Sequence, residues 1–234
     1  MTTNSIRAVV FDIDNTLYDY DAAHAPAFQA LTGYASHELG ISADEFVRRH
    51  AEAEREMRRR CGDNCAALHN RLLRYQVLLE GMGKAPGPAL RMARLYWRTL
   101  LDAIHPYPGA IETLARLRQM DLKVGIGTNM TAENQYEKLI RLGAMSQVDF
   151  IVTSEEITAE KPDRRLFDAC VQKAGCAPEA CVFVGDSLKN DVRGAMDAGM
   201  RAVWFCPEGD LADAIPGSLV ARSHWVLPGL LAKL

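Results

Sequence analysis

Two short acidic segments carry the residues whose types and spacing are best suited to chemistry. Residues 12–16 (DIDNT) contain Asp12 and Asp14, and residues 185–191 (GDSLKND) contain Asp186 and Asp191, about one helical turn apart. Carboxylates held close together repel one another unless a cation or a proton intervenes. Such oxygen-rich groups suit Mg²⁺, with water and phosphate oxygens completing its coordination. Taken alone, each segment is equally an acidic turn whose side chains bind nearby backbone groups.

Two weaker signals lie between the acidic segments. Thr128 and Asn129 stand just before a helical pattern, where a hydroxyl and backbone N–H groups suit a phosphate oxygen. The alternative is that Thr128 or Thr131 only caps that helix. Lys161 lies farther along the chain, and by itself it indicates little, because most lysines are solvated surface groups.

The elements that must position these residues form a regular alternation. Short apolar runs, rich in β-branched and bulky residues, read as strands and cover residues 7–11, 122–126, 148–152, 181–184 and 201–205. Helical patterns between them predict βαβ units and an α/β fold with a doubly wound, mostly parallel, Rossmann-like sheet. Because ligands bind at the carboxyl ends of such strands, we expect the two acidic segments, Thr128 and Lys161 to meet there.

One part of the chain breaks this alternation. It contains no convincing strand but four helical patterns, at residues 21–39, 43–60, 66–81 and 87–103. We therefore predict a four-helix cap domain at residues 18–105, inserted after the first strand. The catalytic core would then consist of residues 1–17 and 106–234, a normal size for an α/β domain.

An arginine-rich stretch lies inside the predicted cap, ending in Arg58–Arg60. Glu54 and Arg58, and likewise Glu56 and Arg60, are four residues apart in the favourable order. A solvated, salt-bridged helix face is therefore a better interpretation of this stretch than a binding site for a polyanion.

The composition excludes several other classes of protein. With 27 Lys and Arg against 30 Asp and Glu, the formal net charge is −3, so no broad basic field exists for a nucleic acid polymer. The apolar runs are far shorter than the about 20 residues of a membrane span, and the first residues lack a signal-peptide pattern. We expect a cytoplasmic protein. Its six cysteines show no CxxC spacing and are expected to be reduced, mostly packed thiols.

Taken in order, the four segments resemble the motifs of the haloacid dehalogenase-like hydrolase superfamily, in its members with an α-helical cap inserted after the first strand. The resemblance extends over nearly the whole chain, and NTLYD at residues 15–19 is similar to the branch that contains phosphatases and nucleotidases. It implies that Asp12 is the nucleophile and Asp14 the general acid and then base. It also implies Mg²⁺ bound by Asp12, the Asp14 carbonyl and Asp186, with Asp191 at the metal or just behind it.

The same resemblance implies that Thr128, the Asn129 backbone and Lys161 hold the phosphoryl group. The implied activity is Mg²⁺-dependent hydrolysis of a small phosphorylated metabolite, a nucleoside monophosphate or a sugar phosphate. An acid at Asp14 disfavours a dehalogenase, because halide leaves without a proton, whereas a phosphosugar mutase retains both aspartates and stays an alternative. A receiver-type phospho-acceptor module is the alternative from another class, although receivers lack a large helical insertion.

The residues that select the substrate are predicted only from their location in the chain. Tyr18, Tyr20, His24, Arg58–Arg60 and residues 61–66 are candidates, with core packing or a solvated surface as the alternative for each. We expect the cap to hinge near residues 17–19 and 105–108. These patterns do not predict the oligomeric state.

Overall fold

The computed structural model describes residues 6–234, so the prediction about a leader at the first residues lies outside the described range. The chain divides into two compact units. The core unit contains the described residues up to Asp19 together with His105–Leu234, and the helical unit is Tyr20–Ile104.

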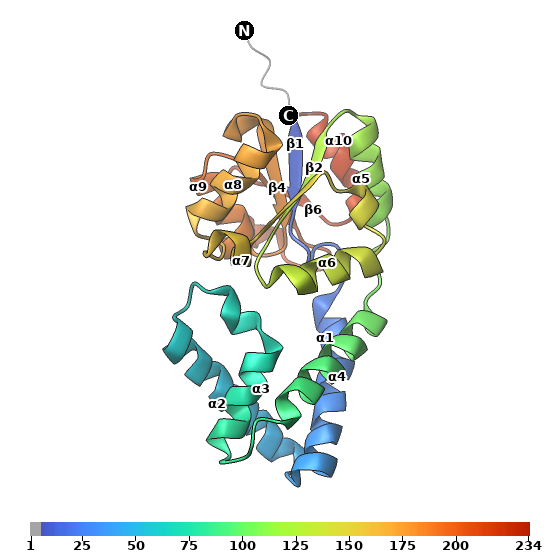
Figure 1. Cartoon of the computed structure of the whole chain (residues 1–234). Coiled ribbons are helices and arrows are strands. Elements are labelled where there is room, and N and C mark those ends of the chain that lie inside the picture. Colours follow the sequence, from blue (N-terminus) through green and yellow to red (C-terminus); the bar gives the residue numbers. More distant parts are fainter. Residues whose placement is uncertain (1–5) are drawn as a thin grey trace. The chain divides into compact units, whose positions relative to one another are not determined.

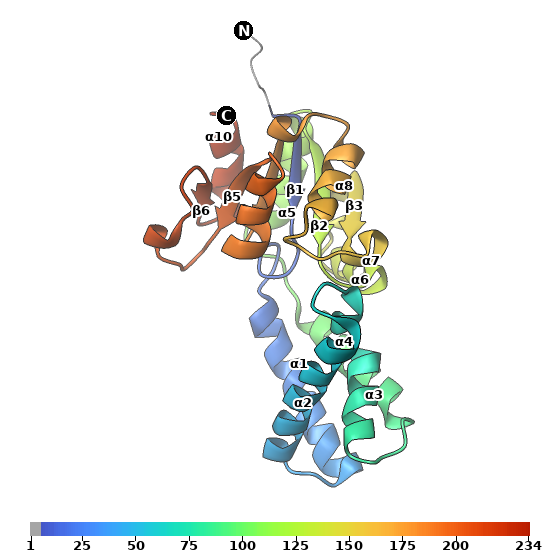
Figure 2. The same cartoon turned by 90° about the vertical axis from the view of Figure 1, so that its left-hand side faces the viewer.

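The core unit is built on one six-stranded parallel sheet in the order β3-β2-β1-β4-β5-β6. In Figure 2 this order runs from β3 at one end to β5 and β6, in red, at the other. Its strands are β1 (Ala8–Phe11), β2 (Lys123–Thr128), β3 (Phe150–Thr153), β4 (Cys181–Gly185), β5 (Arg201–Phe205) and β6 (Leu219–Ala221). The predicted α/β fold is therefore confirmed, and five strands match the predicted runs. β6 was not predicted, because three residues make too short a run to stand out.

Strand β1 lies at the centre of the sheet. Ala8 pairs with Lys123 of β2 on one side and with Cys181 of β4 on the other. All four residues of β1 are buried, as expected for a parallel strand covered on both faces. Strand order reverses direction between β1 and β4, so the crevice at their carboxyl ends is the place where such sheets bind ligands.

Helices cover both faces of the sheet, with α8 and α9 on one face and α5 and α10 on the other (Figure 1). Helix α6 lies across the end of the core at which the strands finish (Figure 1). The helices of this unit are α5 (Ala110–Gln119), α6 (Ala132–Arg141), α7 (Ser154–Ile157), α8 (Arg164–Ala174), α9 (Gly194–Asp197) and α10 (Leu227–Leu231).

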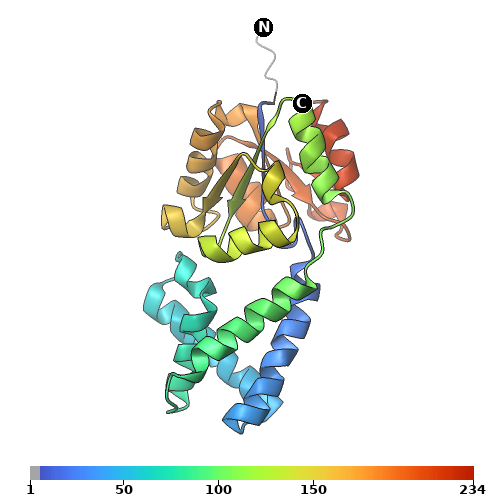
Figure 3. The ribbon, with the colours of Figure 1, turned by 45° about the vertical axis from the view of Figure 1, so that its right-hand side comes forward.

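The helical unit contains the four predicted helices, with local differences. They are α1 (Tyr20–Tyr34), extended by a π-helical turn at Ala35–Leu39, α2 (Ala43–Cys61), α3 (Arg71–Gly81) and α4 (Pro88–Ala103). Helices α1 and α4 lie side by side (Figures 1 and 3). The predicted helix over residues 66–81 is broken at Asn70, whose side chain accepts a hydrogen bond from the Leu73 N–H and caps α3.

One of the two predicted ion pairs on α2 is wrong. Arg60 contacts Glu56 at 2.8 Å, as predicted. Arg58 instead contacts Asp63 at 3.1 Å, and Glu54 contacts Arg74 of α3 at 2.6 Å. Arg74 is buried, so its need for a counter-charge outweighs that of an exposed arginine on the same helix as Glu54.

Two further expectations concern cysteines and membrane spans. All six cysteines are free thiols, and Cys170, Cys181 and Cys206 are buried in the core unit. Among residues 6–234, no helix combines the length and apolar character that crossing a membrane requires.

Candidate active site

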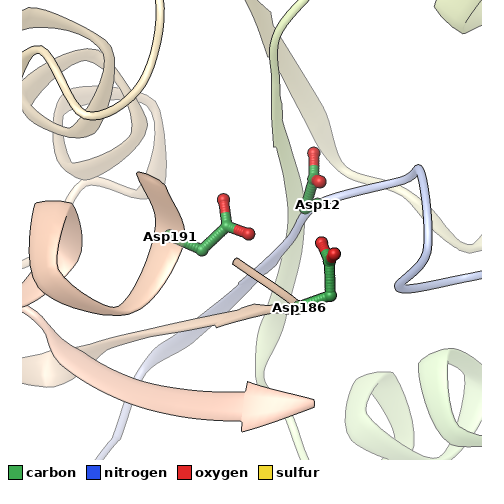
Figure 4. A group of neighbouring side chains, drawn as sticks. All are labelled: Asp12, Asp186 and Asp191. Carbon is green, nitrogen blue, oxygen red and sulfur yellow. The ribbon is translucent and has the colours of Figure 1, made fainter. Parts of the chain in front are cut away.

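Three carboxylates meet beyond the carboxyl ends of β1 and β4. Asp12 directly follows β1, Asp186 directly follows β4, and Asp191 lies in a π-helical turn at Leu188–Arg193. One oxygen from each lies within 4.8 Å of the others, and Figure 4 shows the three carboxylates around a common space. The Asp12 N–H donates to the Val184 carbonyl at 2.9 Å, which continues the β1–β4 ladder into the site.

The turn after β4 fixes Asp191. The Ser187 N–H donates to Asp191 Oδ2 at 2.9 Å, and Asp191 is only 1% exposed. Asp186 precedes this turn, so the two acids are not related by one helical turn as predicted. Asp191 instead packs directly against Gly185, where a Cβ would lie 2.4 Å from Asp191 Cγ.

Lys161 bridges two of the three acids. Its Nζ lies 2.7 Å from Asp12 Oδ1 and 2.7 Å from Asp191 Oδ1, and the side chain is buried. Burial alone would lower the pKa of Lys161, but Asp12 and Asp191 outweigh it and raise that pKa above its usual value. Lys161 is therefore a permanent ammonium beside the proposed nucleophile.

One ammonium does not balance three carboxylates. Burial raises the pKa of Asp12 to about 6, with Lys161 opposing the rise and Asp191 and Asp14 adding to it. Burial, Asp12 and Asp191 together raise the pKa of Asp186 to about 7. Among residues 6–234, the Asp186 carboxylate accepts a hydrogen bond only from the backbone N–H of Asp186 itself. Three crowded carboxylates, of which that of Asp186 accepts no hydrogen bond from another described residue, fit a hard divalent cation such as Mg²⁺.

Asp14 lies apart from this cluster in a different environment. Lys138 Nζ contacts its two carboxylate oxygens at 2.7 and 2.8 Å, and the Tyr18 hydroxyl donates to Oδ1 at 2.5 Å. The Lys138 side chain is 0% exposed, whereas that of Asp14 is 25% exposed. Asp14 is therefore held in orientation by two donors and keeps access to solvent or a ligand.

The role of Lys138 was missed by sequence reasoning. A signal was present, because Lys138 lies on the buried face of α6 together with Gln135 and Leu139. A lysine on the apolar side of an amphipathic helix is rarely buried without an acid to pair with. Tyr18 was a candidate for substrate selection by its location, and in the structure its hydroxyl donates to Asp14 Oδ1.

The last residue of β2 and the residue that follows it both bond to the side chain of Gln135 on α6. Thr128 is buried, and its Oγ1 accepts from Gln135 Nε2 at 2.6 Å, while the Asn129 carbonyl accepts from the same nitrogen at 2.9 Å. Asn129 Oδ1 accepts from the Lys161 N–H at 2.7 Å. Side-chain bonding thus ties the segment of Thr128 to that of Lys161. Thr131 is the N-cap residue that precedes α6, but its hydroxyl accepts from the Asn134 side chain rather than from a helix N–H.

The three acids and Lys161 meet at the carboxyl ends of the two central strands of a parallel α/β core, where enzymes of this fold class carry their chemistry. The helical unit is inserted in the sequence between β1 and β2. The model of the haloacid dehalogenase-like hydrolases matches residues 6–199. The chain therefore belongs to that family and is a hydrolase.

Relatives and solved structures agree with this assignment. Over 204 residues the chain is 38% identical to the glyceraldehyde 3-phosphate phosphatase of Methanopyrus kandleri, covering 85% of this chain and 83% of that protein. Over 221 residues it is 36% identical to the ribulose-1,5-bisphosphate 5-phosphatase of Halopiger xanaduensis, covering 92% of each. The magnesium-bound HAD-hydrolase YfnB of Bacillus subtilis superposes with a TM-score of 0.74 at 23% identity, covering 97% of this chain and 99% of that one. At that identity the likeness shows the fold.

Proposed function

We propose that this hydrolase is a Mg²⁺-dependent phosphatase that releases phosphate from a small phosphorylated metabolite, a sugar phosphate or a nucleoside monophosphate. The observation that carries the proposal is the cluster of Asp12, Asp186 and Asp191, of which Asp12 and Asp191 are buried, with Lys161 bound to the proposed nucleophile. The names of relatives at 36% and 38% identity, both phosphatases of phosphorylated sugars or trioses, support it.

Asp12 is the proposed nucleophile. Its carboxylate would attack phosphorus, giving an aspartyl-phosphate as the leaving oxygen departs. Lys161 holds Asp12 Oδ1 at 2.7 Å, which favours the ionised carboxylate and fixes its orientation. Mg²⁺ bound by Asp12, Asp186, the Asp14 carbonyl and Asp191, directly or from behind, would supply the charge that lets a phosphate dianion approach these acids.

Asp14 is the proposed general acid and base. Its partly exposed carboxyl would protonate the leaving oxygen and would then take a proton from the water that hydrolyses the aspartyl-phosphate. Lys138 and Tyr18 are positioning residues that hold both oxygens of Asp14 between those steps. Thr128 and the Asn129 backbone are proposed to hold the phosphoryl oxygens, with Gln135 fixing the loop that carries them.

The alternatives make different demands on the chain. A dehalogenase expels halide and needs no proton donor, so a carboxyl at Asp14 held by two dedicated donors favours phosphoryl transfer. A receiver module needs no helical unit, whereas Tyr20–Ile104 forms one here. A mutase would use the same aspartates, and only the fate of the phosphoryl group separates it from a phosphatase.

A direct test measures phosphate release with Mg²⁺ from sugar phosphates, nucleoside monophosphates and sialic acid 9-phosphate. We expect turnover by the wild-type protein, none by Asp12→Asn, and wild-type rates for Asp168→Asn, an exposed acid paired with Arg164 on α8. Turnover by Asp12→Asn would refute the nucleophile. Phosphoryl transfer between sugars without phosphate release would indicate a mutase, and stable phosphorylation without turnover would indicate a receiver.

A further inference from the structure

Helix α3 of the helical unit begins with a buried arginine that has no acidic partner. Arg71 is 5% exposed, and no carboxylate among residues 6–234 pairs with it. Its Nη2 donates to the Tyr20 hydroxyl at 3.0 Å and to the Tyr96 hydroxyl at 3.3 Å, and its Nη1 donates to the His69 carbonyl at 3.3 Å. The exposed candidates Arg58–Arg60, by contrast, all contact carboxylates.

The residues around Arg71 do not offset its charge. Arg74, one turn along α3, is paired with Glu54 at 2.6 Å, so this acid neutralises Arg74 and leaves Arg71 unpaired. Burial, together with Arg71 and Arg74, lowers the pKa values of His24 and His50, which keeps both imidazoles neutral near pH 7. An uncompensated buried cation is unfavourable, and its retention is explained if a bound anion supplies the missing charge.

Two donors beside Arg71 are also without partners. The Tyr75 side chain is buried, and its hydroxyl makes no hydrogen bond among the described residues. That hydroxyl lies within electrostatic range of Arg71, Tyr96 and Arg74. Arg74 Nε is buried and unpartnered as well. Buried donors of this kind are normally satisfied, so these point to a group that accepts hydrogen bonds.

The aromatic rings around Arg71 suit recognition of an oxyanion. Its Cζ lies 4.8 Å from the centre of the Tyr96 ring and 5.7 Å from that of Trp97. A guanidinium stacked on aromatic faces presents its N–H edge in a fixed plane, the geometry that matches carboxylate and phosphate oxygens. Tyr20, His24 and Trp97 are only half-buried, so the cluster is not sealed from solvent.

We propose that Arg71, with the hydroxyls of Tyr20, Tyr75 and Tyr96, forms an anion site in the helical unit that binds a carboxylate or phosphoryl group. That anion is either a second charged group of the substrate or a separate small anion. The first source rests on the proposed function and narrows the substrates to phosphorylated metabolites with two anionic groups. The second source does not depend on it.

The substrate source is tested with matched substrates that differ by one anionic group. These are phosphoserine against phosphoethanolamine, and fructose 1,6-bisphosphate against fructose 1-phosphate. Hydrogen bonds to a charged group are worth about 1.5–3 kcal/mol, so Arg71→Met should lower kcat/KM about 10- to 100-fold for the doubly anionic member of a pair. The singly anionic member should change less than about 3-fold. Arg94→Met, an exposed arginine on α4, is the control and should change neither.

The free-anion source is tested by the binding of malonate to the metal-free protein, measured by calorimetry and by the shift in melting temperature. Malonate should bind and stabilise the wild-type protein, Arg94→Met and Asp12→Asn, but not Arg71→Met. This readout needs no turnover, so it still tests the anion site if every phosphate ester proves inert and the proposed function fails.

Two measurements separate an anion site from a structural arginine. Without added anion, Arg71→Met should melt at or above the wild-type temperature, because an unpaired buried charge is removed. Tyr75→Phe should leave that temperature unchanged and weaken malonate binding or doubly anionic substrate binding about 3- to 10-fold. Substrate discrimination without malonate binding identifies the substrate source, and malonate binding without discrimination identifies the free anion. The proposal is overturned if Arg71→Met changes neither substrate discrimination nor malonate binding. It is also overturned if Arg71→Met and Tyr75→Phe lower the melting temperature and change nothing else.

Discussion

The contact between Lys138 and Asp14 gives the sharpest test of the proposed chemistry. Lys138→Met keeps a long, flexible side chain on the buried face of α6 and removes only the ammonium, which contacts both Asp14 oxygens at 2.7 and 2.8 Å. We expect the variant to fold with Asp14 held by Tyr18 alone. The general acid and base would then lose its fixed orientation, while Asp12 and Lys161 stay in place.

The expected magnitudes follow from burial. Removing one partner of a fully buried ion pair costs about 3–5 kcal/mol of unfolding free energy. The Asp14 side chain is 25% exposed and regains hydration, so about 2 kcal/mol is the expected loss. General acid–base catalysis contributes about 100- to 10,000-fold, and misorientation should forfeit part of it, a fall in kcat of about 10- to 100-fold with KM little changed.

The assay uses p-nitrophenyl phosphate, whose phenolate leaves without needing a proton. In a rapid-mixing experiment, the first turnover of Lys138→Met should release phenolate within about 3-fold of the wild-type rate. Later turnovers should be slow, because Asp14 must still activate water at the aspartyl-phosphate. An alkyl phosphate should be slow from the first turnover. Lys173→Met, which removes a lysine paired with Glu156 outside the site, is the control.

Wild-type steady-state turnover by Lys138→Met would refute the positioning role. Equal slowing of the first turnover with aryl and alkyl phosphates would also refute it, since the effect would then not involve proton transfer to the leaving group.

Three further predictions concern metal, backbone and pH. Mg²⁺ should raise the melting temperature more at pH 8 than at pH 5. The pKa values of Asp12 and Asp186 are raised to about 6 and 7, so ionisation of these carboxyls in the metal-free site destabilises the folded protein as pH rises. Equal shifts in melting temperature at the two pH values would contradict this. Gly185→Ala should push Asp191 aside and weaken Mg²⁺ binding about 10-fold by calorimetry, and unchanged affinity would refute the reasoning. Burial lowers the pKa of His224 to about 4 in the folded protein. As pH falls from about 6.5 to 4, His224 is therefore protonated only in the unfolded chain, and the free energy of unfolding should fall by roughly 3 kcal/mol. Urea unfolding across that range should show a smaller loss for His224→Phe.

The fold was predictable because buried parallel strands leave an unmistakable apolar pattern. β1 and β4 are apolar at nearly every position, and Asp12 and Asp186 follow them directly, so the two main acids were found from strand ends alone. β6 has only three residues, two of them partly exposed, and its pattern is too weak to separate from a loop.

Partners that depend on tertiary packing were not predictable. Glu54 has Arg58 four residues away, yet it pairs with Arg74 from another helix because that guanidinium is buried. Lys138 lies far from Asp14 in the sequence, and only the placement of α6 at the strand ends brings them together. Arg71 likewise looks like any arginine at a helix start until its burial is known.

The central position of β1 has a consequence for synthesis of the chain. Ala8 finds its first strand partner at Lys123 and its second at Cys181, so β1 emerges from the ribosome long before either neighbour exists. Contacts of such sequence separation form slowly, and an unpaired apolar strand is prone to aggregation meanwhile. The contiguous helical unit emerges in that interval. A chain that stops before β4 would leave β1 with one edge bare, so premature termination there should yield insoluble protein rather than a weakened enzyme.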